Sequence, residues 1–232
     1  MAREIACWNH PPDRLELGQN QIDLWRVDLD SKYHEYEELR IILDKHELDR
    51  ANRFKFEIDR QRFIASHAVL RIVLSKYIGV LPHNIRLDCG PFGKPLIAMN
   101  SRIEFNMTHS GANTLIAVGT DQRIGADIET IDLEADWQSA ASTCFSSDLI
   151  TKLTCIPKDA STRLFYEHWV CMEASHKAAG EGLLALSGPA ATLWNGTSKY
   201  FLNPFLLGAS TVGAIAAERP AVTLHFYHFD EA

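Results

Sequence analysis

The sequence has few cysteines, and they follow no recognisable spacing. Its 232 residues include five cysteines, an odd number, with no C-x-x-C pair and no histidine-paired spacing. A disulfide framework or a zinc site is therefore not expected. No stretch approaches the 18 apolar residues that a membrane span needs, and the opening MAREIACWNHPPDR lacks the apolar run of a signal peptide. We therefore expect a cytoplasmic protein without membrane attachment.

An overall excess of basic residues is also absent. The formal net charge is −7, which argues against general binding to nucleic acid or to anionic membrane. The segment from Arg40 to Lys76 is an exception, because it holds nine Lys and Arg against five Asp and Glu, a surplus of four. The chain is long enough for one large domain or for two of about 110 residues, and either could bury its own core.

The hydrophobic pattern predicts a mixture of strands and helices without long linkers. Residues 33–78 and 161–179 have apolar residues at helical intervals, and the two runs stop at Gly79 and at Gly180 and Gly182. Alternating or short apolar runs predict strands at 21–30, 84–89, 96–100, 114–121 and 123–130. The tail 210–229 repeats the strand, turn, strand pattern of 114–130, which suggests two related halves.

Two carboxylates lie on one face of the strand predicted at RIGADIET. Asp127 and Glu129 are two positions apart, so their side chains point to the same face, about 6.6 Å apart along the backbone. At an effective dielectric of 20, two negative charges at that spacing repel by roughly 2.5 kcal/mol. Water at an exposed strand end, a basic side chain or a hard cation could offset this repulsion.

A second acidic group comes from the predicted helix that contains WVCMEASHKAAGEGL. Glu173 and Lys177 are four residues apart and share a helix face, in the order that favours an ion pair. An exposed pair of this kind contributes only a few tenths of a kcal/mol. The large apolar residues on the same helix, including Phe165, Trp169 and Met172, indicate instead that the helix is packed against a core.

Two further segments carry polar groups beside glycine. FNMTHSG offers the hydroxyls of Thr108 and Ser110 and the imidazole of His109, which suit phosphate contacts but are also common turn residues. GPFGKP places Lys94 after a glycine-containing turn, although the spacing is not that of a P-loop.

Taken in order, these motifs resemble those of the 4′-phosphopantetheinyl transferases, specifically the larger type with two homologous halves in one chain. The motifs are G-K-P, F-N-x-[ST]-H-S, G-x-D-x-E and W-x-x-x-E-A-x-x-K-x-x-G-x-G-L, and the resemblance extends over roughly residues 20–217. Members of this family transfer the phosphopantetheine arm of coenzyme A to a serine of an apo acyl or peptidyl carrier protein and release 3′,5′-ADP. Such carriers serve fatty acid, polyketide and non-ribosomal peptide synthesis.

The resemblance implies a role for each motif residue. Asp127, Glu129 and Glu173 correspond to ligands of Mg²⁺, an ion that prefers oxygen ligands. Lys177 corresponds to the lysine that contacts the pyrophosphate, and Glu173 is the best candidate for accepting the serine proton. The remaining positions correspond to contacts with coenzyme A, which would be a substrate: Arg50, Lys94, Thr108 and His109.

The sequence departs from the family pattern directly before the motif glutamate. Most members have a lysine there, and this chain has Met172. A non-catalytic homologue that binds coenzyme A or a carrier protein therefore remains an alternative to a working Mg²⁺-dependent enzyme. Carrier proteins of the family are small and acidic, so docking on this acidic chain would need a locally basic surface, for which the segment from Arg40 to Lys76 is the candidate.

The expected fold is α+β, with two similar halves related by a pseudo-twofold axis. Each half would contain a small antiparallel sheet packed by helices, with the active site in the cleft between the halves. We expect residues 1–120 to form the half that contacts the nucleotide and residues 121–232 to form the metal-binding, catalytic half. As in similar members of the family, the protein is expected to be a monomer.

Overall fold

The protein has an α+β fold, as expected. The structure is a computed structural model that describes residues 4–31, 36–99, 101–180 and 193–229. By contacts the chain divides into two compact units. Unit 1 contains residues 1–7, 89–94 and 122–222, and unit 2 contains residues 8–88, 95–121 and 223–232. Whether residues 1–120 and 121–232 behave as separate domains stays a prediction.

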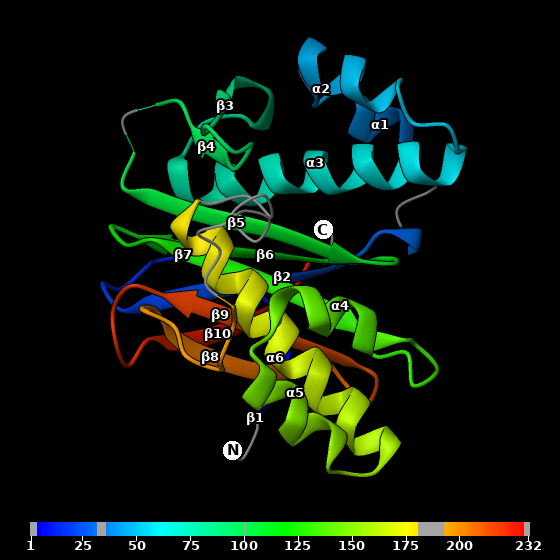
Figure 1. The fold of residues 1–232 in the computed structure, drawn as a ribbon. Helices are drawn as coiled ribbons and strands as arrows, with labels where there is room; N and C mark the ends of the chain where they lie inside the picture. Colours follow the sequence, from blue (N-terminus) through cyan, green and yellow to red (C-terminus); the bar gives the residue numbers. More distant parts are fainter. Residues whose placement is uncertain (1–3, 32–35, 100, 181–192, 230–232) are drawn as a thin grey trace. The chain divides into compact units, whose positions relative to one another are not determined.

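Unit 2 is a four-stranded sheet covered on one face by a long helix. Its sheet has the strand order β10-β2-β6-β5, in which β10 is parallel to β2 and the other pairs are antiparallel. The helix α3 lies across this sheet (Figure 1). The elements assigned to this unit are β2 (Gln21–Asp28), α1 (Tyr36–Arg40), α2 (Lys45–Ala51), α3 (Glu57–Ile78), the 3₁₀ turn Pro82–Asn84, β3 (Leu87–Cys89, whose last residue falls in unit 1), β4 (Pro95–Ile97), β5 (Ile103–Ser110), β6 (Asn113–Thr120) and β10 (Thr223–His228).

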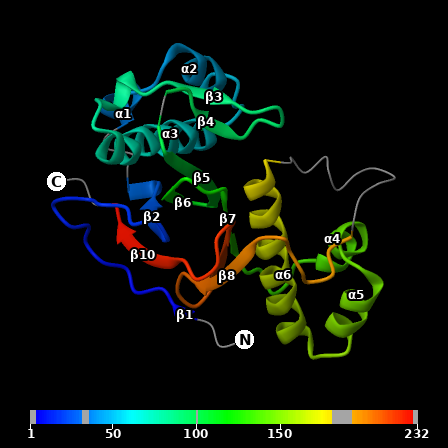
Figure 2. The ribbon, with the colours of Figure 1, turned by 90° about the vertical axis from the view of Figure 1, so that its left-hand side faces the viewer.

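Unit 1 repeats this plan with its own sheet and long helix. The strand order is β1-β8-β9-β7, with β1 parallel to β8 and the other pairs antiparallel. The helix α6 packs against β7, β8 and β9, and α4 and α5 flank it (Figure 2). The elements are β1 (Glu4–Ile5), β7 (Ile124–Thr130), α4 (Trp137–Cys144), α5 (Ser147–Thr154), α6 (Lys158–Ala179), β8 (Phe201–Leu206) and β9 (Thr211–Ala217).

The two units share one chain path, which confirms the prediction of two similar halves. Each runs from a strand to a 22-residue helix and then to a hairpin whose second strand returns beside the first, giving β2-β6-β5 and β7-β9-β8. Each long helix ends at a glycine in the left-handed region, Gly79 at φ 75° and Gly180 at φ 72°. Glycine is favoured there because it has no Cβ to clash with the following carbonyl.

The fourth strand of each sheet comes from the opposite end of the chain. The N-terminal strand β1 joins the sheet of unit 1, and the C-terminal strand β10 joins the sheet of unit 2. This connectivity explains why the tail resembles residues 114–130. Each segment begins with the second strand of a hairpin, continues through a short polar turn and ends with a strand of the other sheet. These pairs of strands are β6 and β7 in one segment and β9 and β10 in the other.

Each unit has its own hydrophobic core beneath its long helix. In unit 2 the core includes Trp25, Leu70, Phe105 and Ile116, and in unit 1 it joins α4, α5 and α6 to β9. A buried cation fixes α2 against α3 in unit 2. Arg71 is 1% exposed and donates to Glu47, Asp44 and the carbonyls of Pro82 and Ile85. A buried charge is tolerated when it is paired and hydrogen-bonded in this way.

Several elements differ from the predicted pattern. The helices predicted within residues 33–78 are α1, α2 and α3, whereas the sequence does not predict α4, α5 and β8. Thr108, His109 and Ser110 lie in β5, so the interpretation of these residues as a turn is wrong. Gly182 lies outside the described residues. The five cysteines all lie within the described residues, and no disulfide occurs there. None of the helices described in the structure is both long enough and apolar enough to span a membrane.

Candidate active site in unit 1

The polar face of β7 carries the two acidic residues that the sequence placed on one side of a strand. Asp127 is buried, 4% exposed, and Glu129 is half-buried. Both share their face with Gly125, since alternate residues of a strand point the same way. The residues between them, Ala126 and Ile128, are buried on the other face. The strand is the outer strand of its sheet and pairs with β9 along its whole length, which fixes the direction of these side chains.

The helix α6 approaches that face very closely at Gly125. A Cβ atom at Gly125 would lie 2.0 Å from the carbonyl oxygen of Ala174 and 2.4 Å from the backbone nitrogen of Ala178. Only glycine fits such an approach, because the obstructing atoms are backbone and cannot rotate away. In the motif G-x-D-x-E, Gly125 therefore allows α6 to pack closely on β7. Asp127 and Glu129, on the same face of the strand, then point toward the helix.

Lys177 joins α6 to β7 through an ion pair. Its Nζ lies 2.5 Å from Oδ1 of Asp127, and the two side chains are 30% and 6% exposed. The alternative of an exposed Glu173–Lys177 surface pair is therefore wrong. Glu173 is only 7% exposed, and Lys177 forms its ion pair with Asp127, a buried carboxylate on a different element. A partly buried ion pair of this kind is much less screened by solvent than a surface pair.

Glu173 lies within the electrostatic field of the other three charged groups. The pKa of Glu173 is raised to about 7, chiefly by burial and next by the negative charge of Asp127. The ammonium of Lys177 acts in the opposite direction, and Glu129 adds a smaller increase. The structure thus brings Asp127, Glu129, Glu173 and Lys177 together in one unit, as the motif order implied.

The carboxylate oxygens of Asp127, Glu129 and Glu173 suit a hard cation, but in this structure they do not converge on a single point. Oε1 of Glu173 is buried and has no hydrogen-bond partner among the described residues. A buried carboxylate oxygen without a donor is costly unless a cation or water satisfies it. Across the described ranges, no three His, Cys, Asp or Glu side chains form a ready metal cluster. In this geometry the ammonium of Lys177 compensates the charge of Asp127.

Lys94 lies in unit 1 beside the same helix and strand. Its Nζ donates to the carbonyl oxygens of Ile124 and Lys177, at 2.9 Å each. The contact of Lys94 with the nucleotide of coenzyme A stays a prediction, and the sequence does not predict these two backbone contacts. No sequence signal identifies them, because the partners are carbonyl groups, which every residue possesses.

The other three predicted contacts with coenzyme A belong to unit 2. Arg50 is exposed on α2, with its guanidinium carbon 5.1 Å from the centre of the Phe63 ring. Thr108 is buried and His109 is exposed, both on β5. Because consecutive residues of a strand point to opposite faces, Thr108 and His109 present their side chains in different directions. They are therefore better suited to two different phosphate groups than to one.

Met172, the departure from the family pattern, is a core residue. Its side chain is fully buried and packs in the hydrophobic core of unit 1. Glu173 and Lys177, by contrast, face β7. A thioether fills a core position without needing a hydrogen-bond partner, so the exchange of lysine for methionine is accommodated by packing.

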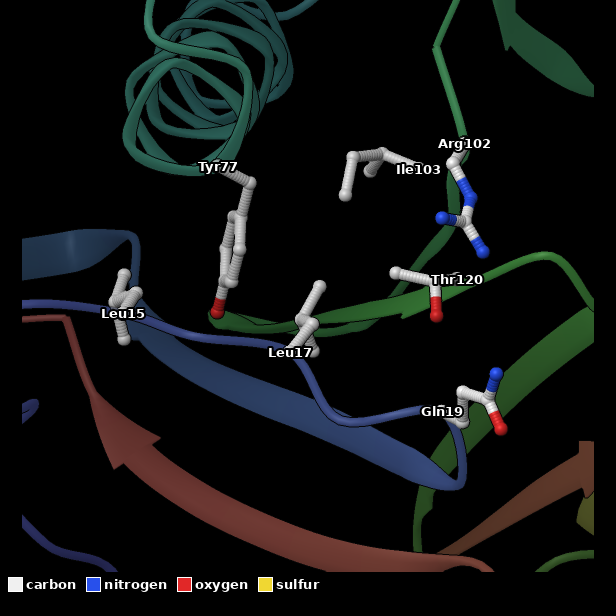
Figure 3. A pocket seen from close by; sticks show the side chains of 7 residues that line it. All are labelled: Leu15, Leu17, Gln19, Tyr77, Arg102, Ile103 and Thr120. Atoms are coloured by element: carbon white, nitrogen blue, oxygen red, sulfur yellow. The ribbon is translucent and has the colours of Figure 1, made fainter.

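A pocket in unit 2 contains none of the predicted residues. It has a volume of about 370 Å³ and is lined by Leu15, Leu17, Gln19, Tyr77, Arg102, Ile103 and Thr120 (Figure 3). The hydroxyl of Tyr77 points away from α3 and donates to Oδ2 of Asp23 at 2.7 Å. Arg102 is paired with Asp121. The two strongest polar groups of this pocket are thus engaged within the protein.

The fold and this site define a two-unit α+β protein in which one unit gathers three carboxylates and a lysine between a strand and a helix. Family models match both parts of the chain. One described as 4′-phosphopantetheinyl transferase, N-terminal, matches residues 29–121, and one described as the 4′-phosphopantetheinyl transferase superfamily matches residues 123–208. The chain belongs to the 4′-phosphopantetheinyl transferase superfamily.

Curated relatives carry the same description. The chain is 34% identical over 182 residues to the 4′-phosphopantetheinyl transferase HetI of a Nostoc species, covering 77% of each protein. It is 29% identical over 160 residues to the 4′-phosphopantetheinyl transferase Sfp of Bacillus subtilis, covering 68% of this chain and 69% of Sfp. It is 31% identical over 121 residues to AcpT of Escherichia coli, covering 52% and 58%. These matches confirm the predicted family and its transferase class.

Proposed function

We propose that this protein is a Mg²⁺-dependent enzyme that transfers the 4′-phosphopantetheine arm of coenzyme A to a serine of an apo carrier protein. The observation that carries this proposal is the convergence on Glu173. Its buried carboxylate interacts electrostatically with Asp127, Glu129 and Lys177, where α6 contacts β7. An acidic cluster with a built-in cation is suited to a reaction between highly charged phosphates.

Asp127, Glu129 and Glu173 would hold the metal ion. The fit is supported by their oxygen-only donor set and by the buried Oε1 of Glu173, which lacks a donor among the described residues. When bound, Mg²⁺ supplies charge neutralisation for the pyrophosphate of coenzyme A. Lys177 would then be released from Asp127 and donate to the pyrophosphate, where its positive charge stabilises the departing 3′,5′-ADP.

The reaction forms one bond and breaks one. The serine oxygen of the carrier attacks the phosphorus that bears the pantetheine arm, and the bond from that phosphorus to the bridging oxygen of the pyrophosphate breaks. The oxygen and its electron pair leave with 3′,5′-ADP. Glu173 is the candidate acceptor of the serine proton, with a neighbouring water as the other possibility. In-line placement and charge neutralisation supply most of the catalysis in phosphoryl transfer.

Unit 2 would bind the nucleotide end of coenzyme A. Arg50, Thr108 and His109 supply a cation, a hydroxyl and an imidazole, and the opposite directions of Thr108 and His109 on β5 suit separate phosphates. We assign His109 to the 3′-phosphate. The ammonium of Lys94 is not included among the phosphate contacts, because two of its three protons are donated to backbone carbonyls.

The carrier protein would dock on the basic segment of unit 2. That segment is less basic than its sequence suggests, because five of its nine cations form ion pairs within the protein: Arg40, Lys45, Arg60, Arg62 and Arg71. Attraction of an acidic partner would therefore rest on the exposed Arg50, Arg53, Lys55 and Lys76. We also propose that the protein acts as a cytoplasmic monomer without nucleic-acid or membrane partners. Its pathway would be fatty acid, polyketide or non-ribosomal peptide synthesis.

One assay separates transfer from mere binding. The protein is incubated with coenzyme A, Mg²⁺ and a panel of apo carrier proteins, and the intact mass of each carrier is measured. A mass gain of one phosphopantetheine arm on any carrier, absent when EDTA replaces Mg²⁺, is expected. If coenzyme A binds in a Mg²⁺-dependent way and no carrier gains mass, the non-catalytic homologue is the correct description.

A further inference from the structure

We propose that Lys94 is a positioning residue, which fixes the last turn of α6 on the start of β7 and so sets the approach of Lys177 and Glu173 to Asp127. This inference rests on the proposed function for its catalytic consequence, although its structural part can be tested alone. It replaces the expected contact between the Lys94 ammonium and the nucleotide.

The two acceptors of Lys94 belong to the two elements that build the site. The carbonyl of Ile124 belongs to the first residue of β7, and the carbonyl of Lys177 lies in the last turn of α6. The carbonyl of Lys177 also accepts the N–H of Gly180 at 3.2 Å, and carbonyls in the last turn of a helix carry the negative end of the helix dipole, which favours a cation. An ammonium that donates to one of them and also to the neighbouring strand therefore ties the helix end to the strand.

These contacts lie at the point where helix and strand are closest. Ile124 directly precedes Gly125, and Lys177 directly precedes Ala178, the residue whose nitrogen would be 2.4 Å from a Cβ at position 125. Gly125 permits the close approach but does not hold it, because glycine contributes no side chain. Lys94 supplies a directional bond on each side of this contact, which fixes how far along the strand the helix sits.

Lys177 connects the contact made by Lys94 to the ion pair with Asp127. Lys177 offers its carbonyl to Lys94 at 2.9 Å and its ammonium to Asp127 at 2.5 Å. Glu173 lies one helical turn earlier on the same face. A shift of the helix end would therefore move both charged side chains relative to β7, and displacements of about 1 Å at such sites cost as much as 100-fold in rate.

The loop before Lys94 is built to deliver its side chain to this place. The backbone of Gly90 donates to the carbonyl of Lys94 at 2.8 Å, and Gly93 donates back to Gly90 at 2.9 Å. Gly93 adopts φ 82°, which favours glycine. The turn is thus closed by its own hydrogen bonds, and the half-buried ammonium of Lys94 is directed at the carbonyls of α6 and β7.

The test compares Lys94→Met with Lys152→Met, which removes an exposed lysine of α5 in the same unit. Both variants and the unmodified protein are studied without coenzyme A, first by amide hydrogen exchange and then by binding of Mn²⁺, followed by electron paramagnetic resonance. We expect Lys94→Met to accelerate exchange at residues 176–180 and to weaken Mn²⁺ binding by about tenfold or more, as removal of outer groups around metal ligands does. Lys152→Met should change neither.

Steady-state kinetics then separate positioning from direct contact. A positioning role predicts that Lys94→Met lowers kcat more than it raises the KM for coenzyme A, since the geometry of Lys177 and Glu173 is disturbed. Unchanged exchange and Mn²⁺ affinity, together with a raised KM for coenzyme A alone, would overturn the inference in favour of a phosphate contact.

Two further results remain informative. If Lys94→Met does not fold, Lys94→Ala, which also removes the side-chain donors, is measured instead, and exchange at residues 176–180 as slow as in the unmodified protein would refute the inference. If the unmodified protein binds no Mn²⁺ and modifies no carrier, the proposed function fails, whereas the exchange comparison still decides whether Lys94 holds α6 on β7.

Discussion

The ammonium of Lys177 lies 2.5 Å from Oδ1 of Asp127, although the two residues are 50 positions apart. The contact joins the end of α6 to the middle of β7. The ion pair stabilises the packing of α6 on β7, and under the proposed function the same ammonium would leave Asp127 and contact the pyrophosphate of coenzyme A.

Replacing Lys177 by methionine should remove both the ion pair with Asp127 and the proposed contact with the pyrophosphate. Loss of a charge that stabilises the transition state typically lowers kcat by about 100-fold or more, and the buried Asp127 would lose its partner, which lowers the free energy of unfolding. Added Mg²⁺ should restore much of that stability, because it supplies the missing positive charge. Transfer assays and denaturant unfolding with and without Mg²⁺ measure these effects, with Lys152→Met as control. A variant with full kcat would exclude Lys177 from the chemistry.

Replacing Glu173 by glutamine should abolish transfer and stabilise the metal-free protein. The carboxylate at this position is buried beside two other acids, so an uncharged group of the same shape removes an unfavourable interaction. We expect the Tm of the metal-free protein to rise by about 3 °C or more and the increase in Tm on adding Mg²⁺ to be lost. Glu134→Gln, at an exposed ion pair, is the matched control. Near-normal turnover of Glu173→Gln would eliminate both the ligand role and the base role.

Replacing Gly125 by alanine should force α6 away from β7. The added Cβ would meet backbone atoms at 2.0 and 2.4 Å, and overpacking against atoms that cannot rotate costs about 3 kcal/mol or more. Denaturant unfolding measures the loss, and transfer activity should fall with it. Gly18→Ala is the control, since its Cβ would have no contact shorter than 3.5 Å. Equal stability of the two variants would contradict the close packing at Gly125.

The stability of unit 2 should depend on pH through Asp23. This side chain is fully buried, and burial raises its pKa, against the opposing effects of Gln21, Tyr77 and His225. Because the pKa of Asp23 is higher in the folded protein than in the unfolded chain, Asp23 contributes most to stability when it is protonated, at pH values below the unfolded-state pKa of about 3.9. This contribution is lost as the pH rises through the pKa of the folded state. Asp23→Asn should therefore gain stability relative to the unmodified protein as the pH rises above 4. Denaturant unfolding at several pH values measures the difference, with the exposed Asp13→Asn as control. A difference that does not change with pH would contradict this prediction.

The sequence predicted most of what depends on local pattern. The strand that carries Asp127 and Glu129 and the helix that carries Glu173 and Lys177 follow from apolar periodicity, and their order identified the family. The short helices α4 and α5 were missed because their serines and threonines give a weak helical pattern. The strand β8 was missed because it contains Pro204, which usually argues against a strand. Among the described residues, β1 pairs with Phe205 and Leu206 and does not extend to Pro204, which is consistent with a proline at this position.

Contacts between distant segments could not be predicted. The i, i+4 spacing suggested a pair between Glu173 and Lys177, whereas the lysine reaches across to Asp127 because the helix packs at Gly125. The motif G-K-P identified Lys94 as a cation but not as a ligand of two carbonyls. Backbone acceptors leave no trace in a sequence, so their partners emerge only from the packing of the whole unit.

The exchange of edge strands between the units has a consequence for synthesis of the chain. The sheet around β2 lacks its partner β10 until residues 223–228 have left the ribosome, so the half that is made first is also the last to be completed. Removal of β1 or of β10 would take one strand from a sheet whose other strands come from the remote half of the sequence. Expression of residues 1–120 and 121–232 as separate polypeptides would leave each without one of its outer strands.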